Sequence, residues 1–419
     1  MKKIALLFPG QGSQYSGMGE DIYKRYPETR NIYNEANEIL KFDLYKLVQE
    51  GSREELTRTE NAQPAIFVHS YATFKLFEKE FGIKPTFLAG HSLGEISALT
   101  CAGAINFGDA VAILRKRGEL MRDAVVGRES GMMAVMGMHK EYVEGLCTEV
   151  STGGEVAVIS NLNSPEQIVV SGTKKALDNL QDILSGKAAK VVPLNVSAPF
   201  HSPLMEDAAE SFEQFLNQFR FNDFTHPVLS NASAAVYQDK HEITKSLREQ
   251  MVKAVQWEKI MAVLEREGVE ATVELGPNQV LKKLSMANTA GIKAYAFDDQ
   301  HDRAEMRDAL IGKEKPTEIL SMLFVTRCMA HAVCTKNNNW NEEEYEKGVI
   351  IPYKKVKSMQ ETLEEQGKEP TEEQMREALD MLASVFHIKN VPEDERMKRF
   401  NSLLDETQTS HLFADFKIM

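Results

Sequence analysis

One short motif constrains the fold of this chain more than any other feature. Residues 90–94 read GHSLG, a G-x-S-x-G pattern that directly follows an apolar stretch and directly precedes a helical pattern. This is the context of a nucleophile elbow, in which a serine occupies a sharp strand-to-helix turn above a sheet. The N-terminus of the following helix would aim free backbone N–H groups at the same place. The motif therefore predicts a strand–turn–helix unit with Ser92 as a nucleophile beside donors for an oxyanion.

The stretches on either side extend this unit into a larger domain. Residues 1–126 and 199–304 alternate short apolar runs with amphipathic stretches, which predicts a parallel sheet covered by helices. Between them, residues 127–198 show the order strand, helix, strand, strand, helix, strand, as in a ferredoxin-like fold. We therefore expect a small ferredoxin-like subdomain inserted into the α/β core. Residues 305–419 are helix-like and mostly rich in charge, so we expect a mainly helical C-terminal extension.

Length, charge and cysteine content limit the partners and the compartment. A chain of 419 residues predicts two or three domains. Its net charge of -13 gives no global basic footprint, so we expect no nucleic-acid partner. No apolar stretch reaches the roughly 18 residues of a membrane helix, and the run at Ile4–Phe8 is shorter than the roughly 7–15 residues of a signal-peptide core. Four cysteines suggest a reducing compartment. We expect a cytoplasmic protein without membrane attachment.

A serine nucleophile requires a base, and the sequence offers ten histidines. His91 is adjacent to Ser92, so its side chain should diverge on the sharp turn. His201 follows a predicted strand and lies in a turn with small neighbours, where an imidazole can face a cleft. From its position alone, His201 fits a solvent-exposed loop histidine as well as a general base.

Six motifs together resemble a known family, the malonyl-CoA:acyl carrier protein transacylases and the acyltransferases of polyketide synthases. In chain order they are Phe8-Pro9-Gly10-Gln11-Gly12-Ser13-Gln14, Gly90-His91-Ser92-Leu93-Gly94-Glu95, Arg117-Gly118, Asn161-Leu162-Asn163-Ser164-Pro165, Phe200-His201 and Val255-Gln256-Trp257. The resemblance covers about residues 1–300 and implies an α/β-hydrolase-like core.

The resemblance also implies a ping-pong acyl transfer. Ser92 would attack the thioester of malonyl-CoA with His201 as general base, and the malonyl group would pass to the phosphopantetheine thiol of an acyl carrier protein. The backbone N–H groups of Gln11 and Leu93 would form the oxyanion hole, and the backbone carbonyl of Gln256 would orient the histidine. No cofactor and no metal are implied. A histidine with an unperturbed pKa of about 6.5 predicts that loading falls as the pH drops through that region.

The acyl pocket implied by the resemblance contains Arg117, because a guanidinium pairs with both oxygens of a carboxylate and so favours dicarboxylic acyl groups. On helical pattern alone, Arg117 would fit an exposed helix face instead. Phe200 before the histidine goes with malonyl rather than methylmalonyl, since its ring fills the space of an alpha substituent. Gln63 and Met121 match further pocket positions. Aminomalonyl or hydroxymalonyl units stay possible.

Other functions stay open on the sequence alone. A hydrolase that clears acyl groups from carrier proteins would share Ser92 and His201 but would have no use for Arg117. An unrelated serine esterase would require a triad acid, and a scaffold of a synthase complex would require no nucleophile.

The extension beyond residue 305 is most similar to that of free-standing, trans-acting polyketide acyltransferases. We expect it to pack on the core or to help to recognise a partner. Cys328, His331 and Cys334 have a spacing that suits a metal site, but they fit a packed helix equally well.

Overall fold

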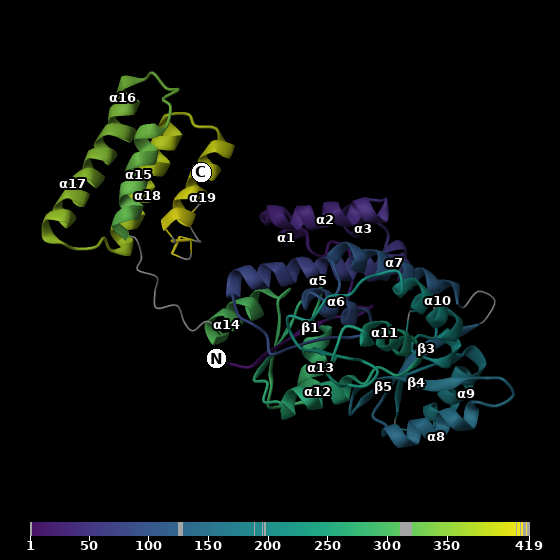
Figure 1. The fold of residues 1–419 in the computed structure, drawn as a ribbon. Helices are drawn as coiled ribbons and strands as arrows, with labels where there is room; N and C mark the ends of the chain where they lie inside the picture. The colour runs from purple at the N-terminus through teal and green to yellow at the C-terminus, as the bar shows by residue number, and fades with distance from the viewer. Residues whose placement is uncertain are drawn as a thin grey trace. The chain divides into compact units, whose positions relative to one another are not determined.

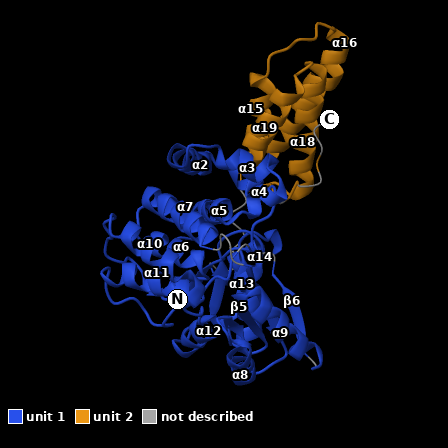
Figure 2. Cartoon of the chain, turned by 90° about the vertical axis from the view of Figure 1, so that its right-hand side faces the viewer, with its two compact units in different colours: residues 1–312 blue, residues 313–419 orange. Residues whose placement is uncertain are grey.

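The computed structural model divides the chain into two compact units, residues 1–312 and residues 313–419, which Figure 2 draws in different colours. Each unit has a hydrophobic core of its own. The structure describes residues 2–124, 129–187, 189–194, 196, 198–310, 321–407, 409–410, 412–413 and 416.

The first unit contains a five-stranded parallel sheet (Figure 1). Its strands lie in the order β7-β2-β1-β8-β9, and all neighbouring pairs are parallel. The parallel sheet predicted from the strand–helix alternation is confirmed. The strands are β1 (Ile4–Phe8), β2 (Phe87–Gly90), β7 (Val228–Leu229), β8 (Ala271–Glu274) and β9 (Lys293–Ala296).

Helices cover both faces of this sheet. In β1, Ile4, Leu6 and Phe8 enter one hydrophobic cluster, whereas Ala5 and Leu7 enter another, because successive side chains of a strand point to opposite faces. The second cluster draws on α12 (Trp257–Arg266) and α13 (Val280–Asn288). The first cluster draws on α1 (Glu20–Arg25), α2 (Pro27–Leu40), α3 (Leu44–Glu50), α4 (Arg53–Thr57), α5 (Thr59–Phe81), α6 (Leu93–Cys101), α7 (Phe107–Asp123), α10 (Glu206–Leu216), α11 (Glu242–Val252) and α14 (Gln300–Leu310).

The inserted subdomain is a four-stranded antiparallel sheet in the order β4-β5-β3-β6, and its two helices share one core with it. The first and third strands are adjacent at its centre, which is the ferredoxin-like arrangement that the sequence predicts. The expected start of the insertion, between residues 126 and 127, lies outside the described residues. The elements are β3 (Ser130–Met136), α8 (Lys140–Val150), β4 (Ala157–Ser164), β5 (Gln167–Thr173), α9 (Lys174–Ser185) and β6 (Lys190–Pro193).

The second unit is helical, as expected. Its helices enclose a separate core that includes Phe324, Leu382 and Phe386. The expected boundary between residues 304 and 305 falls inside α14, and Met306 of that helix is buried in the core of the first unit. The helix therefore belongs to the first unit. The helices of the second unit are α15 (Ser321–Cys334), α16 (Glu342–Tyr345), a π-helix (Glu346–Ile350), α17 (Ile351–Gln366), α18 (Glu372–Ile388) and α19 (Glu393–Thr407).

The cysteines of the extension lie in different environments. Cys328 is buried in the core of the second unit, while Cys334 is exposed, so the packed-helix interpretation accounts for Cys328.

Over the described part of the chain, no helix combines the length and the apolar character that a membrane crossing requires.

Candidate active site

Ser92 lies on a strained turn between β2 and α6. β2 ends at Gly90 and α6 begins at Leu93, so only two residues connect the strand to the helix. The backbone of Ser92 has φ 54° and ψ -113°, which is costly for a residue with a Cβ atom. A strained residue persists only where the surrounding structure holds it. The turn has the strand–turn–helix form that the motif predicts.

The two glycines of the motif allow the strand and the helix to approach each other closely. A Cβ atom on Gly90 would lie 1.8 Å from the backbone oxygen of Gly94, and one on Gly94 would lie 2.0 Å from the backbone oxygen of Phe8. Neither position can hold a larger residue without movement of the backbone. The glycines are therefore required by packing at the turn.

The structure brings His201 to the nucleophile. Ser92 Oγ and His201 Nε2 are 2.8 Å apart, although the residues are 109 positions apart in the sequence. His201 Nδ1 lies 2.6 Å from the backbone oxygen of Gln250. A carbonyl can only accept, so Nδ1 carries the proton and Nε2 is left free to accept the proton of Ser92.

The carbonyl that orients the histidine differs from the expected one. It belongs to Gln250, in the last turn of α11, and not to Gln256. The last four carbonyl groups of a helix have no partner within the helix, which leaves that of Gln250 free to accept. Gln256 instead precedes α12, and its backbone N–H donates to the backbone oxygen of Asn231 (2.9 Å). The assignment of Gln256 is wrong.

Burial, and secondarily the charge of Arg117, lower the pKa of His201 to about 3. The imidazole is 3% exposed, and an apolar environment disfavours its charged form. The premise of an unperturbed pKa near 6.5 is therefore wrong for the free protein, and the expected fall in loading near that pH loses its basis. His201 is neutral, and able to accept a proton, across the physiological range.

Arg117 is buried beside the nucleophile and does not lie on an exposed helix face. It is 1% exposed, and its Nη2 atom lies 3.2 Å from Ser92 Oγ. Nη1 donates to Gln63 Oε1 (2.9 Å), and Nη2 donates to Gln250 Oε1 (2.8 Å). Burial lowers the pKa of Arg117 to about 10, an effect that the charge of Glu95 opposes. The cation is therefore ionised at neutral pH, and its hydrogen bonds go to neutral oxygen atoms.

One cavity of about 270 Å³ joins these groups. Its lining includes all of the predicted site residues except Gln256. The residues included are Gln11, Gln63, Ser92, Leu93, Arg117, Met121, Phe200 and His201. Among the described residues, the backbone N–H groups of Gln11 and Leu93 donate to no other group. Both amides are therefore free for an oxyanion.

Three residues of the site have no counterpart in the sequence-based prediction. Glu95, Asn231 and Gln250 surround the turn at Ser92 with hydrogen bonds. Asn231 Oδ1 accepts the Ser92 N–H (2.7 Å), and Asn231 Nδ2 donates to the Gly90 carbonyl (2.6 Å). The position of Glu95 three residues after the nucleophile is a signal that was available. Asn231 and Gln250 lie more than 130 residues away in sequence and carry no such signal.

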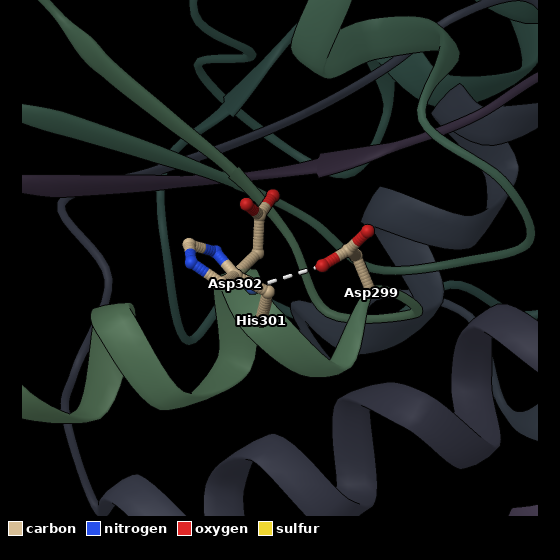
Figure 3. A group of neighbouring side chains, drawn as sticks. All are labelled: Asp299, His301 and Asp302. Carbon is tan, nitrogen blue, oxygen red and sulfur yellow. Dashed lines mark hydrogen bonds between the residues drawn. The ribbon is translucent and has the colours of Figure 1, made fainter.

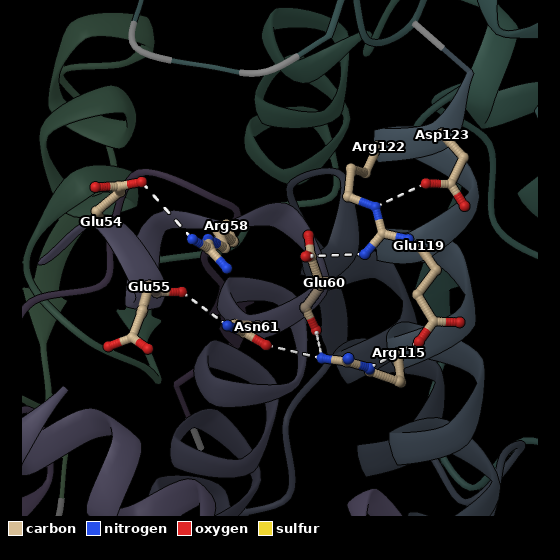
Figure 4. Close-up of polar contacts among 9 residues, drawn as sticks. All are labelled: Glu54, Glu55, Arg58, Glu60, Asn61, Arg115, Glu119, Arg122 and Asp123. Carbon is tan, nitrogen blue, oxygen red and sulfur yellow. Dashed lines mark hydrogen bonds and ion pairs between the residues drawn. The ribbon is translucent and has the colours of Figure 1, made fainter. Parts of the chain in front are cut away.

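A polar network supports the two helices that carry the pocket residues Gln63 and Arg117 (Figure 4). Arg115 Nη1 donates to the backbone oxygen of Glu60 (2.9 Å). Arg122 Nη1 pairs with the side chain of Glu60 (2.9 Å). These bonds hold the start of α5 against α7, and this fixes Gln63 next to Arg117.

A second polar group lies at the start of α14. Asp299, His301 and Asp302 are near enough to one another to hold a metal ion (Figure 3). However, Asp299 Oδ1 accepts the Asp302 N–H (3.0 Å) at the helix N-terminus. Asp302 accepts from Lys282 Nζ (2.8 Å) and from the Ala296 N–H (2.8 Å). These bonds account for the two carboxylates as a helix cap and as a link to β9.

Comparisons with known proteins extend these observations. A family model described as an acyl transferase domain matches residues 5–327. A malonyl CoA-acyl carrier protein transacylase of Bacillus subtilis (strain 168) is 44% identical over 300 residues, which cover 71% of this chain and 94% of the relative. Another Bacillus subtilis protein of that name is 33% identical over 398 residues, which cover 95% of this chain and 99% of the relative. This second likeness therefore continues through the second unit.

Solved structures are similar to the first unit. An acyl carrier protein S-malonyltransferase from Vibrio cholerae has a TM-score of 0.70 at 35% identity, over 73% of this chain and 99% of that one. A malonyl-transacylase solved in complex with a type II polyketide synthase acyl-carrier protein has a TM-score of 0.71 at 34% identity, over 74% of this chain and 100% of that one.

Proposed function

Because this chain belongs to the malonyl-CoA:acyl carrier protein transacylase family, we propose that it moves a malonyl group from coenzyme A to the phosphopantetheine thiol of an acyl carrier protein. One observation carries the proposal for the site. A serine–histidine pair and a buried, ionised arginine share a single cavity. The pair supplies acyl transfer, and the arginine supplies a preference for an acyl group with a free carboxylate.

In the first half of the reaction, Ser92 becomes acylated. Its Oγ attacks the thioester carbonyl of malonyl-CoA as His201 Nε2 takes the hydroxyl proton. The negative oxygen that develops is stabilised by the backbone N–H groups of Gln11 and Leu93. When the carbon–sulfur bond breaks, His201 returns the proton to the departing coenzyme A thiol. A malonyl ester on Ser92 remains.

The second half reverses these roles. The phosphopantetheine thiol of the carrier protein gives its proton to His201 and attacks the ester carbonyl. The bond between the carbonyl carbon and Ser92 Oγ breaks, and the serine oxygen takes the proton from His201. The Gln250 carbonyl keeps the imidazole in the tautomer that both halves require (2.6 Å). All of these groups belong to this chain and its substrates, so the proposed steps use no cofactor.

Arg117 is proposed to select the acyl group. In the empty site its guanidinium bonds to the side-chain oxygens of Gln63 and Gln250, which are neutral acceptors. A malonyl carboxylate offers stronger, charge-assisted bonds to the same cation. Phe200 and Met121 line the same cavity and are proposed to limit the space for an alpha substituent, which favours malonyl over bulkier extender units.

The biological setting is proposed on the same grounds. One solved relative is bound to a type II polyketide synthase acyl-carrier protein, and the family resemblance implies polyketide or fatty acid biosynthesis. We therefore place the reaction in one of these two kinds of pathway. The four cysteines are free, which fits the reducing cytoplasm.

Intact-mass measurement tests the proposal. After incubation with malonyl-CoA, the wild-type chain should carry one malonyl adduct, and the Ser92→Ala variant should carry none. Addition of a holo-acyl carrier protein should move the adduct to the carrier. A wild-type chain that stays unmodified would contradict the proposed function.

The Arg117→Ala variant separates this function from a carrier-protein hydrolase, which the relatives' names also disfavour. Removing one partner of a buried charge pair costs about 3–5 kcal/mol, so kcat/KM for malonyl loading should fall by a factor on the order of 10²–10⁴. Acetyl loading should rise relative to malonyl loading. Lys116→Ala, on the same helix, is the control and should change neither rate. Persistent malonyl loading in Arg117→Ala would contradict the pocket assignment.

A further inference from the structure

Glu95 lies one helical turn after the nucleophile, and no step of the proposed reaction uses it. Its side chain is completely buried, and no ion pair within the described residues involves it. Its hydrogen-bond partners are three neutral donors, which are Tyr237 OH (2.5 Å), Gln250 Nε2 (2.6 Å) and the Asn231 N–H (3.1 Å). Burying a carboxyl group that forms no ion pair is costly. The buried carboxyl group of Glu95 must therefore have a structural or functional role that offsets this cost.

Two of these three partners hold the strained turn at Ser92. Asn231 accepts the Ser92 N–H and donates to the Gly90 carbonyl. Gln250 Nε2 donates to the Ser92 carbonyl (2.9 Å) as well as to Glu95 Oε2. Glu95 thus accepts from the backbone N–H of Asn231 and from the side-chain amide of Gln250, the two residues whose side chains keep the nucleophile in its unfavourable backbone conformation.

Gln250 also connects the other two functional groups. Its backbone oxygen accepts from His201 Nδ1, and its side-chain Oε1 accepts from Arg117 Nη2. If the side-chain amide of Gln250 rotated by 180°, its NH₂ group would face the Arg117 guanidinium, and two hydrogen-bond donors would face each other. An acceptor at Glu95 Oε2 keeps the NH₂ group on the opposite side.

We propose that Glu95 is a positioning residue whose Oε2 atom fixes the Gln250 amide and Asn231, and so aligns Ser92 and Arg117. The role depends on an acceptor atom at this place. Within the described residues, the hydrogen-bond partner of Oε1 is the Tyr237 hydroxyl, which can either donate or accept. A proton at Oε1 therefore leaves Oε2 as an acceptor. The effect on acyl selectivity rests on the proposed function, whereas the effect on Ser92 does not.

If an acceptor atom is required at Glu95, then Glu95→Met and Glu95→Gln should have different effects on the rate of Ser92 acylation. Glu95→Met fills similar space without an acceptor. In this variant, the rate of Ser92 acylation per folded site should fall by a factor on the order of 10², as expected for misplaced reacting groups, and the preference for malonyl over acetyl should fall with it. Glu95→Gln should retain most of the rate and of the preference, because its amide can turn oxygen to Gln250 and NH₂ to Tyr237.

Two further variants keep the test decisive if Glu95→Met does not fold. Tyr237→Phe alone leaves the carboxylate in place and should behave as the wild type. The double variant Glu95→Gln/Tyr237→Phe leaves the new NH₂ group without its partner, so its loss should exceed the sum of the losses of the two single variants. Asp302→Asn is the matched control. It removes a buried carboxylate that bonds to Lys282 and Ala296, so it should lower the Tm and leave the rate per site unchanged.

A fluorophosphonate probe, which labels active serines without a malonyl group, separates this inference from the proposed function. If the wild type formed no malonyl adduct, the labelling rates of Ser92 in the same variants would still test the positioning role. Wild-type labelling and selectivity in a folded Glu95→Met variant would overturn the inference. Equal losses in Glu95→Gln and Glu95→Met would also overturn it, because charge and not an acceptor atom would then be responsible.

Discussion

At the scale of single residues, the site depends on how burial changes the protonation of its groups. His201 and Arg117 are both buried, and the pKa of each is lowered, to about 3 and about 10 respectively. For the histidine, this shift secures the neutral form that can accept a proton. For the arginine, it still leaves the cation that a carboxylate requires. The same burial therefore leaves the base neutral and the carboxylate receptor charged.

We expect His201 not to titrate between pH 8 and pH 5. Its pKa of about 3 in the folded chain lies below that range, so the imidazole stays neutral throughout. Carbon-13 NMR of labelled histidine, assigned through the loss of one signal in His201→Gln, measures this directly. A titration midpoint near 6.5 would contradict it. A loading rate that shows no inflection from His201 in this range is thus compatible with His201 as the base.

The same shift affects stability with a defined sign. The unfolded chain binds a proton at His201 below about pH 6.5, whereas the folded chain does not until about pH 3. The stability contributed by the neutral imidazole is therefore complete above pH 6.5 and is lost as the pH falls below it. Between pH 7.5 and 5, wild type should lose about 2 kcal/mol more unfolding free energy than His201→Gln in urea titrations.

At the scale of secondary-structure elements, the contact between β2 and α6 decides whether the nucleophilic turn can form. The two elements approach so closely that each flanking glycine faces a backbone oxygen atom. Backbone atoms cannot move aside as a flexible side chain can. Substitutions at these positions should therefore damage stability and activity together.

Gly94→Ala tests this contact. Its Cβ atom would lie 2.0 Å from the Phe8 oxygen, so we expect a loss of about 3 kcal/mol or more together with loss of Ser92 loading. Gly145→Ala is the matched control. It lies on an exposed part of α8 with nothing within 4 Å of the added atom, and it should gain about 0.5–1 kcal/mol. Urea unfolding measures both changes, and equal effects of the two substitutions would contradict the packing argument.

At the scale of the whole molecule, the hydrophobic clusters separate the two units. The core of the second unit draws only on residues 324–413, whereas every residue in the lining of the cavity lies before residue 285. The groups proposed for acyl transfer thus all belong to the first unit. The second unit forms a core without them.

A chain that ends at residue 312 should therefore keep malonyl loading of Ser92 within about twofold of the full chain, as expected for independent parts. In calorimetry, the full chain should show two transitions, and the shortened chain should show only one of them. Loss of loading in a folded 1–312 chain would show that the second unit contributes to the site.

The sequence by itself determined the local parts of this protein. The turn at Ser92 requires a glycine on either side within five residues, so a short motif was enough to predict it. The alternation of apolar runs likewise predicted the parallel sheet, because a strand buried on both faces reads as a continuous apolar run, and the order of strands and helices predicted the second sheet. The family resemblance added His201 and Arg117, which their own sequence neighbourhoods left ambiguous.

Only the tertiary structure decided which groups support these residues. Every residue has a backbone carbonyl, so no residue type marks the one that orients His201, and the choice of Gln256 failed where Gln250 holds the place. The folded chain also decided that the pKa of His201 is low, since burial depends on everything packed around the ring. Asn231 and Gln250 meet Glu95 across more than 130 residues, because the ends of β7 and α11 converge on one turn, and local sequence carries no record of that convergence.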